Sequence, residues 1–257
     1  MPDVRTQNDF ADQLAADGVL LLHQLCNSEF VGRIMAVSRQ RIGEVQAALG
    51  TREIGIGSAA GYEEIVQRSP GRWDVPISPQ QFGFDDKELP WWPLVASVLG
   101  DDAEHSFSGV VFSDPGSPAQ FWHIDSPHES ARHLAPHALN VLVALHAIPM
   151  AMGPTEFARG SHILTNHLNN PALVRDALIY QHASTSPRRL VQDIGSPEPE
   201  RFVCDLDKGS CLLFDDRLLH RGLANRTEST RHVAYFSYRR QGYSANTHFE
   251  SQRSVFA

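Results

Sequence analysis

The chain has 257 residues, of which 42% are hydrophobic, and this composition is typical of one globular domain. Its 22 basic and 30 acidic side chains give a formal net charge of −8, which argues against nucleic acid as a partner, because nucleic-acid binders usually carry a basic face. No apolar run reaches the length of about eighteen residues that a membrane span needs, and no basic-then-apolar signal opens the chain. We therefore predict one cytoplasmic domain over residues 1–257, with small molecules rather than membranes as partners.

The first 105 residues are expected to be mostly helical and irregular. Asn27 can cap a helix that runs towards Leu49, because apolar residues recur at helical spacing between them. Pro93 can open a second, short helix. Between these helices, the stretch 50–84 is punctuated by glycine and proline and shows little periodicity, so we predict an irregular segment there.

The remaining residues, 106–257, are rich in short β-type runs that turn residues separate. The expected strands are residues 106–113, 139–148, 202–206, 210–214 and 232–239. A helical insertion is expected near 171–180, where an Asn-Pro pair precedes the helical pattern. Many short strands with turns between them favour an all-β architecture that is closed or built from two sheets.

Three side chains have the chemistry and the spacing of an iron site. His123 and Asp125 stand two residues apart in Phe-Trp-His-Ile-Asp, and alternate residues of a strand point to the same side. His220 lies far along the chain and has to meet them through the fold. Two imidazoles and one carboxylate on one face of a metal leave the other face open, as in non-haem Fe(II) oxygenases. We therefore predict that His123, Asp125 and His220 bind Fe(II) and that the chain activates O₂.

The His-x-Asp spacing alone is a weak indication. A chain with 13 histidines contains such pairs by chance, and an isolated pair is usually an ordinary surface feature. A similar pair, His248 and Glu250, has no matching arginine downstream of it. The prediction therefore depends on the segments that accompany His123.

Four segments, taken in order, resemble the phytanoyl-CoA dioxygenase family of Fe(II)- and 2-oxoglutarate-dependent oxygenases. They are residues 10–22, the Trp-His-Ile-Asp motif at 122–125, the Gly-Pro…Gly-Ser-His segment at 153–162, and His220 followed by Arg231. The resemblance implies a mainly β fold with flanking α-helices, namely the double-stranded β-helix or cupin-like jelly roll. It implies that residues 10–22 form a helix, an Asp-Gly turn and a strand, and that the cofactors are Fe(II) and 2-oxoglutarate.

On this resemblance, Arg231 is expected to anchor the distal carboxylate of 2-oxoglutarate. A guanidinium presents a rigid fork of donors that matches a carboxylate, which the point charge of a lysine serves less specifically. Two residues after the distal histidine, where some relatives carry a serine that touches the co-substrate, this chain has Gly222. We expect Thr155 or Gln120 to supply the substitute hydroxyl or amide.

The predicted reaction is the oxidation of a small metabolite, most simply by hydroxylation, with conversion of 2-oxoglutarate to succinate and CO₂. We expect Arg72 and Trp73, in the irregular stretch, to reach over the mouth of the barrel and recognise a polar or anionic substrate. His128 follows the metal motif closely and is expected to line the entrance. Arg239 shares strand parity with Arg231 and would suit a carboxylate-bearing substrate.

Two other classes of function stay open at this point. A cupin-type metal enzyme that does not use 2-oxoglutarate would keep the metal ligands but would not need Arg231. A non-catalytic ligand-binding jelly roll would need no open-faced iron site, so the three ligand residues argue against it. Fe(II) binding, and its effect on 2-oxoglutarate binding, distinguishes the three classes.

Overall fold

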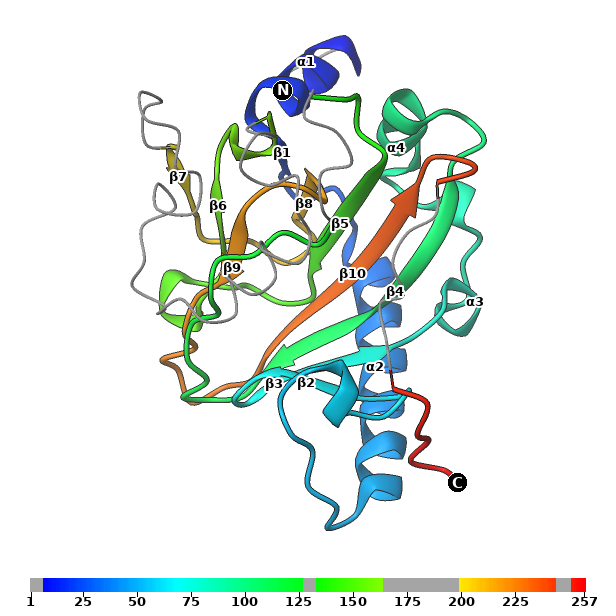
Figure 1. The fold of residues 1–257 in the computed structure, drawn as a ribbon, viewed down its shortest axis with the longest axis vertical. Helices are drawn as coiled ribbons and strands as arrows, with labels where there is room; N and C mark the ends of the chain where they lie inside the picture. Colours follow the sequence, from blue (N-terminus) through cyan, green and yellow to red (C-terminus); the bar gives the residue numbers. More distant parts are fainter. Residues whose placement is uncertain (1–6, 127–132, 164–198, 244–250) are drawn as a thin grey trace.

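The computed structural model describes residues 7–126, 133–163, 199–243 and 251–257, whose strands form two antiparallel sheets (Figure 1). The larger sheet contains β1 (Val19–Leu22), β2 (Val66–Ser69), β3 (Arg72–Pro76), β4 (Glu104–Ser113), β5 (Ala138–Ala144), β8 (Cys211–Asp215) and β10 (Arg231–Arg239). Its seven strands lie in the order β1-β8-β5-β10-β4-β3-β2. The smaller sheet contains β6 (Thr155–Ala158), β7 (Arg201–Phe202) and β9 (His220–Gly222), with β6 in the middle.

Helices flank the larger sheet, and the longest of them runs behind it in Figure 1. The α-helices are α1 (Gln7–Asp17), α2 (Ser28–Leu49), α3 (Pro79–Phe82) and α4 (Trp92–Leu99). Single 3₁₀ turns occur at η1 (Ser58–Ala60), η2 (Asp86–Glu88), η3 (Met150–Met152) and η4 (Ser161–Ile163). The Asn27 side chain caps α2 by accepting from the Phe30 N–H at 2.8 Å, as the sequence predicted. In the described ranges, no helix combines the length and the apolar composition needed to cross a bilayer.

Alternate residues of the large sheet face two different cores. The outer face packs against the helices, with Val141 and Phe236 from the strands meeting Ile34 of α2 in one apolar cluster. The inner face packs against the small sheet, where the rings of Phe157 and Phe214 lie 5.1 Å apart. The space between the two sheets is therefore where inward-facing polar side chains are shielded from water.

The stretch 50–84 is not irregular throughout, so that part of the prediction is wrong. It contributes β2 and β3, which extend the large sheet beyond β4. Arg72 and Asp74 of β3 are buried polar residues, so the strand lacks the apolar alternation that usually reveals one. The expected strand at 139–148 ends at Ala144, that at 202–206 shrinks to β7, and the helix expected near 171–180 lies outside the described residues.

The turn before β8 and the start of α2 approach each other closely at Gly209. This residue has φ +85, its carbonyl accepts from the Cys26 N–H at 3.0 Å, and an added Cβ would overlap the Cys26 carbonyl oxygen. We expect Gly209→Ala to lower the free energy of unfolding by about 1–3 kcal/mol, measured by urea denaturation.

Gly43→Ala is the matched control for this substitution. Gly43 lies within α2 and has open space around the position of an added Cβ. Alanine there should raise the free energy of unfolding by about 0.5–1 kcal/mol, because it favours the helix. Equal stability of Gly209→Ala and the parent protein would contradict the close approach.

Candidate functional site

Backbone pairing brings the three predicted metal ligands together. His123 and His220 form an antiparallel bridge in which each N–H donates to the other's carbonyl, at 3.0 and 2.9 Å. Their ring centroids lie 4.4 Å apart, and His220 Nε2 lies 3.7 Å from Asp125 Oδ2. One potential ligand atom from each of His123, Asp125 and His220 lies within 4.8 Å of the other two. This is the geometry of three side chains that converge on one point.

The segment that carries the first two ligands is not a strand, contrary to our expectation. Between residues 121 and 126 only His123 takes part in a β-type bridge, and Asp125 lies in a bend. Asp125 is directed instead by the turn after β8, because the Asp216 carbonyl accepts from the N–H groups of Asp125 and Ser126 at 2.8 and 3.2 Å. The bend therefore has a defined position without a strand ladder.

Both imidazoles are oriented by their own loops. The Nδ1 atoms of His123 and His220 lie 2.9 Å from the carbonyl oxygens of Phe121 and Leu218 respectively. A carbonyl only accepts, so each Nδ1 carries the hydrogen and each Nε2 keeps a lone pair for a metal. Burial, and next the neighbouring His220, lower the pKa of His123 to about 4, so this imidazole is neutral at physiological pH.

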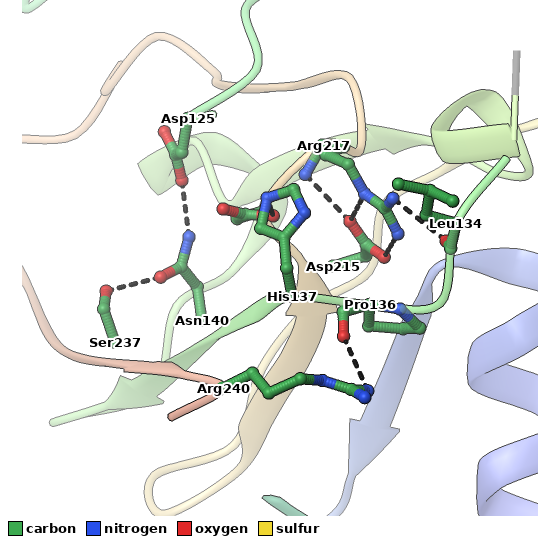
Figure 2. A network of polar contacts seen from close by, with 10 residues as sticks. Asp125, Leu134, Pro136, His137, Asn140, Asp215, Arg217, Ser237 and Arg240 are labelled. Atoms are coloured by element: carbon green, nitrogen blue, oxygen red, sulfur yellow. Dashed lines mark hydrogen bonds and ion pairs between the residues drawn. The ribbon is translucent and has the colours of Figure 1, made fainter. Parts of the chain in front are cut away.

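Asn140 directs the carboxylate of Asp125, and the sequence analysis did not identify it. Its Nδ2 donates to Asp125 Oδ2 at 2.6 Å, while Ser237 Oγ donates to its Oδ1 (Figure 2). Asn140 and Ser237 are paired residues of β5 and β10 and are almost fully buried. The donated hydrogen from Ser237 determines which end of the amide faces Asp125. A lone polar residue in the apolar run of β5 was the available signal.

A buried ion pair supports this loop from behind. Arg217 donates to both carboxylate oxygens of Asp215, from Nε at 2.8 Å and from Nη2 at 2.6 Å. Its Nη1 donates to the Leu134 carbonyl at 3.1 Å, which ties the start of β5 to the same turn (Figure 2). Because Asp216 lies between these two residues, the pair holds the carbonyl that directs Asp125.

Two buried arginines lie on either side of Ser113 in the large sheet. Arg72 of β3 and Arg231 of β10 both pair with Ser113 of β4. The Ser113 hydroxyl accepts from Arg72 Nε at 3.0 Å and from Arg231 Nη2 at 3.1 Å. Arg231 also donates to the Gly153 carbonyl. Within the part of the chain that the structure describes, neither arginine forms an ion pair. Burial lowers the pKa of Arg231 to about 10, and burial together with Arg231 lowers that of Arg72 to about 9, so both stay charged at neutral pH.

Gln120 and Thr155 both lie next to Gly222, as expected. The Gly222 N–H donates to Gln120 Oε1 at 2.9 Å, and Thr155 is the cross-strand partner of Gly222. The amide oxygen of Gln120 is therefore engaged with the backbone. Whether either side chain contacts the co-substrate stays a prediction.

The structure gives a separate outcome for each residue that was predicted to recognise substrate. Arg72 is fully buried in β3 and does not reach over a mouth. Trp73 points to the opposite face, where its Nε1 donates to Asp114 at 2.8 Å, so it does not line the same pocket. Arg239 lies at the end of β10 and is paired with Glu104 at 3.0 Å, which already balances its charge. His128 lies outside the described residues.

A family model decides the relationship of the chain to known proteins. The model of phytanoyl-CoA dioxygenase (PhyH) matches residues 17–233. The chain belongs to the phytanoyl-CoA dioxygenase family. As a member of this family it is an Fe- and 2-oxoglutarate-dependent enzyme, as the sequence predicted.

Solved structures share the fold of this PhyH protein. It is similar to the epimerase SnoN in complex with Fe³⁺, α-ketoglutarate and nogalamycin RO, with 19% identity over 91% of this chain and 83% of that one and a TM-score of 0.64. AviO1 from Streptomyces viridochromogenes Tue57 is 14% identical over 95% and 100% of the two chains, with a TM-score of 0.64. HygX from Streptomyces hygroscopicus, with nickel, 2-oxoglutarate and hygromycin B bound, is 16% identical over 96% and 93%, with a TM-score of 0.59. The predicted jelly-roll fold is confirmed.

The Asp215–Arg217 pair should be a strong determinant of stability. Asp215→Asn leaves a buried guanidinium without its counter-charge, so we expect a loss of about 3–5 kcal/mol in the free energy of unfolding at pH 7. Burial raises the pKa of Asp215, but the hydrogen bonds and the charge of Arg217 outweigh burial, and the net pKa is lowered. The contribution of the pair is therefore present above about pH 4 and is lost as the pH falls further.

Urea denaturation at pH 7 and pH 3 measures both effects. The difference between Asp215→Asn and the parent protein should shrink at the lower pH. As a control, the double variant Asp215→Asn with Arg217→Met should lose less than Asp215→Asn alone, since no unpaired charge is left. A double variant that loses more than the single one would contradict this account.

Proposed function

We propose that this protein is a non-haem Fe(II)- and 2-oxoglutarate-dependent dioxygenase that hydroxylates a small-molecule metabolite and releases succinate and CO₂. The observation that carries the proposal is the convergence of His123, Asp125 and His220 within 4.8 Å. It is supported by the buried cations, Arg231 and Arg72, which are suited to an organic anion.

The donor set fits Fe(II). Two neutral imidazole nitrogens and one carboxylate are its usual ligands in enzymes that leave a face of the metal open for substrates. We propose His123, Asp125 and His220 as these ligands and Arg231 as the residue that holds the distal carboxylate of 2-oxoglutarate. Bound Fe(II), with 2-oxoglutarate and O₂, supplies the oxidising chemistry that the side chains themselves lack.

The role of the surrounding residues is to position and shield. The rings of Phe214 and Phe157 lie 4.9 and 5.9 Å from that of His220 and keep water from one side of it. Asn140 holds the carboxylate of Asp125 in one orientation. These contacts reduce the freedom of the ligands before any metal arrives, which favours tight binding.

The inner face beside Asp125 is polar and supports a polar substrate. Tyr235 donates to Asp74 at 2.8 Å, and Arg68 pairs with the same carboxylate at 2.8 Å. Burial lowers the pKa of Arg68, but Asp74 and, to a smaller degree, Tyr235 and Asp125 raise it, so Arg68 lies within the field of a proposed metal ligand. We propose this face as the wall of the substrate pocket.

The similar proteins indicate the class of substrate and the range of outcomes. SnoN was solved with nogalamycin RO and HygX with hygromycin B, so we propose a small organic molecule for this chain as well. SnoN is an epimerase, and the same fold therefore also supports a reaction that moves hydrogen rather than adding oxygen. We propose hydroxylation as the outcome here.

Anaerobic addition of Fe(II) and then 2-oxoglutarate tests the proposal. A chelate of the two on the protein should give a weak visible metal-to-ligand charge-transfer band. The band should be absent in His123→Ala, which loses a ligand, and should need about ten- to a hundredfold more 2-oxoglutarate in Arg231→Ala, which loses charge-assisted hydrogen bonds.

Each negative result has its own meaning. Iron binding without the band would favour a cupin-type metal enzyme that does not use 2-oxoglutarate. No iron binding would leave a non-catalytic jelly roll and would overturn the proposal. Arg239→Ala is the matched control, because its partner Glu104 is accessible and the pair lies far along β10 from Arg231.

Asn140→Leu should weaken metal binding without removing a ligand. Leucine has a similar size but cannot donate to Asp125, so we expect about a ten- to a hundredfold lower affinity for Mn(II) in isothermal titration. Ser237→Ala should have a smaller effect, since it removes only the contact that orients the amide. Unchanged Mn(II) affinity in Asn140→Leu, with the fold intact by circular dichroism, would show that Asn140 does not position the ligand.

A further inference from the structure

Arg72 occupies the space that a side chain at position 222 would fill. A Cβ added to Gly222 would lie 2.8 Å from Gln120 Oε1 and 3.0 Å from both Cζ and Nη1 of Arg72. Gly222 and His220 are alternate residues of β9, so this space is on the same face of the strand as the proposed metal ligand. The absence of a side chain at Gly222 is what admits the guanidinium to this face.

The contacts of Arg72 hold it in place without neutralising it. Its Nε donates to the Ser113 hydroxyl, and its Nη1 and Nη2 donate to the carbonyls of Gly222 and Leu223 at 3.3 and 2.9 Å. All three acceptors are uncharged. A guanidinium has five N–H groups, so two of them take part in no hydrogen bond with the described residues.

Arg72 is also close to both parts of the proposed site. It shares the Ser113 hydroxyl with Arg231, whose charge lowers the pKa of Arg72 after burial does. On the other side, its Nη1 donates to the carbonyl of Gly222, two residues from His220 in β9. Two buried like charges held together are costly unless an anion joins them.

We infer that Arg72 is a second binding residue for the distal carboxylate of 2-oxoglutarate, beside Arg231. The inference rests on the proposed function, because it assumes 2-oxoglutarate as the co-substrate. Ser113 sets the spacing of the two guanidinium groups, and Gly222 leaves the room for one of them. Arg72 thus takes the part for which we had expected Thr155 or Gln120.

The competing explanation is that Arg72 only braces the carbonyls of β9. Binding of two 2-oxo acids separates the two roles. 2-Oxopentanoate has the same five carbons as 2-oxoglutarate but a methyl group in place of the distal carboxylate. A residue that touches this carboxylate affects 2-oxoglutarate alone, whereas a residue that only braces β9 affects both acids equally.

The experiment is isothermal titration of both acids into Mn(II)-loaded protein. For Arg72→Met, we expect the affinity for 2-oxoglutarate to fall by about ten- to a hundredfold, as for the loss of hydrogen bonds to a charged group. The affinity for 2-oxopentanoate should change by less than about threefold. An equal loss for both acids, or no loss for either, would overturn the inference.

Gly222→Ser provides a second test, which in the parent protein removes no buried charge. In the parent protein the serine side chain should displace the Arg72 guanidinium and weaken 2-oxoglutarate binding. In Arg72→Met the guanidinium is gone, and the Gln120 amide that remains near the added Cβ ends a flexible side chain that can shift, so the serine hydroxyl should strengthen binding. The effect of one substitution should thus change sign with the residue at position 72, and the same sign in both backgrounds would overturn the inference.

The outcomes for the parent protein separate the two proposals. If Mn(II)-loaded parent protein does not bind 2-oxoglutarate, the proposed function fails. If it binds 2-oxoglutarate in preference to 2-oxopentanoate and Arg72→Met keeps that preference, only the role of Arg72 fails. Thermal unfolding of each variant identifies any that lose the fold. If Arg72→Met loses it, Gly222→Ser in the parent protein decides: weaker binding of 2-oxoglutarate but not of 2-oxopentanoate supports the inference, and any other result overturns it.

Discussion

The backbone bridge between His123 and His220 is the contact on which the arrangement of the site depends. Two hydrogen bonds join a segment without a strand ladder to β9, and they bring residues almost a hundred positions apart to one point. The side-chain contacts at Nδ1 then turn both imidazoles the same way. Because the bridge uses backbone atoms only, the side chains remain available for chemistry. The local pairing therefore defines the site before any metal takes part.

Around this bridge the protein concentrates buried charge, and it does so in two different ways. Asp215 and Arg217 neutralise each other within the chain, which makes them a brace for the neighbouring carbonyl of Asp216. Arg72 and Arg231 share a hydroxyl but have no described carboxylate partner. The first arrangement is neutral as a pair, whereas the second keeps two positive charges with no counter-charge among the described residues, which suits the organic anion that we propose. Burial therefore has opposite consequences for the two arrangements, because only the Asp215–Arg217 pair contains both charges.

The sequence was most informative where it contains a rare combination of residue types. Two imidazoles, a carboxylate and an arginine in this order are unusual, and the structure brings the two imidazoles and the carboxylate together. It was least informative for β3 and its neighbour β2, because β3 pairs with β4 across more than thirty residues and such non-local pairing leaves no periodic signal of its own. The inward Arg72 also breaks the apolar alternation of β3. Asn140 was not identified because its role depends on a non-local contact as well, namely its hydrogen bond to Asp125, fifteen positions away.

The placement of the arginines on paired strands has a consequence for how such a protein can diversify. Arg72, Ser113 and Arg231 are aligned by the register of three neighbouring strands, and a slip of one residue would turn a side chain to the opposite face. An insertion that shifted one of these three positions would therefore break their alignment, whereas the connections between strands carry no such restriction. A protein that retains this sheet can lengthen or replace its loops to accept new molecules while Arg72, Ser113 and Arg231 keep their alignment. New specificities would then arise by changes in loops around a sheet whose register stays the same.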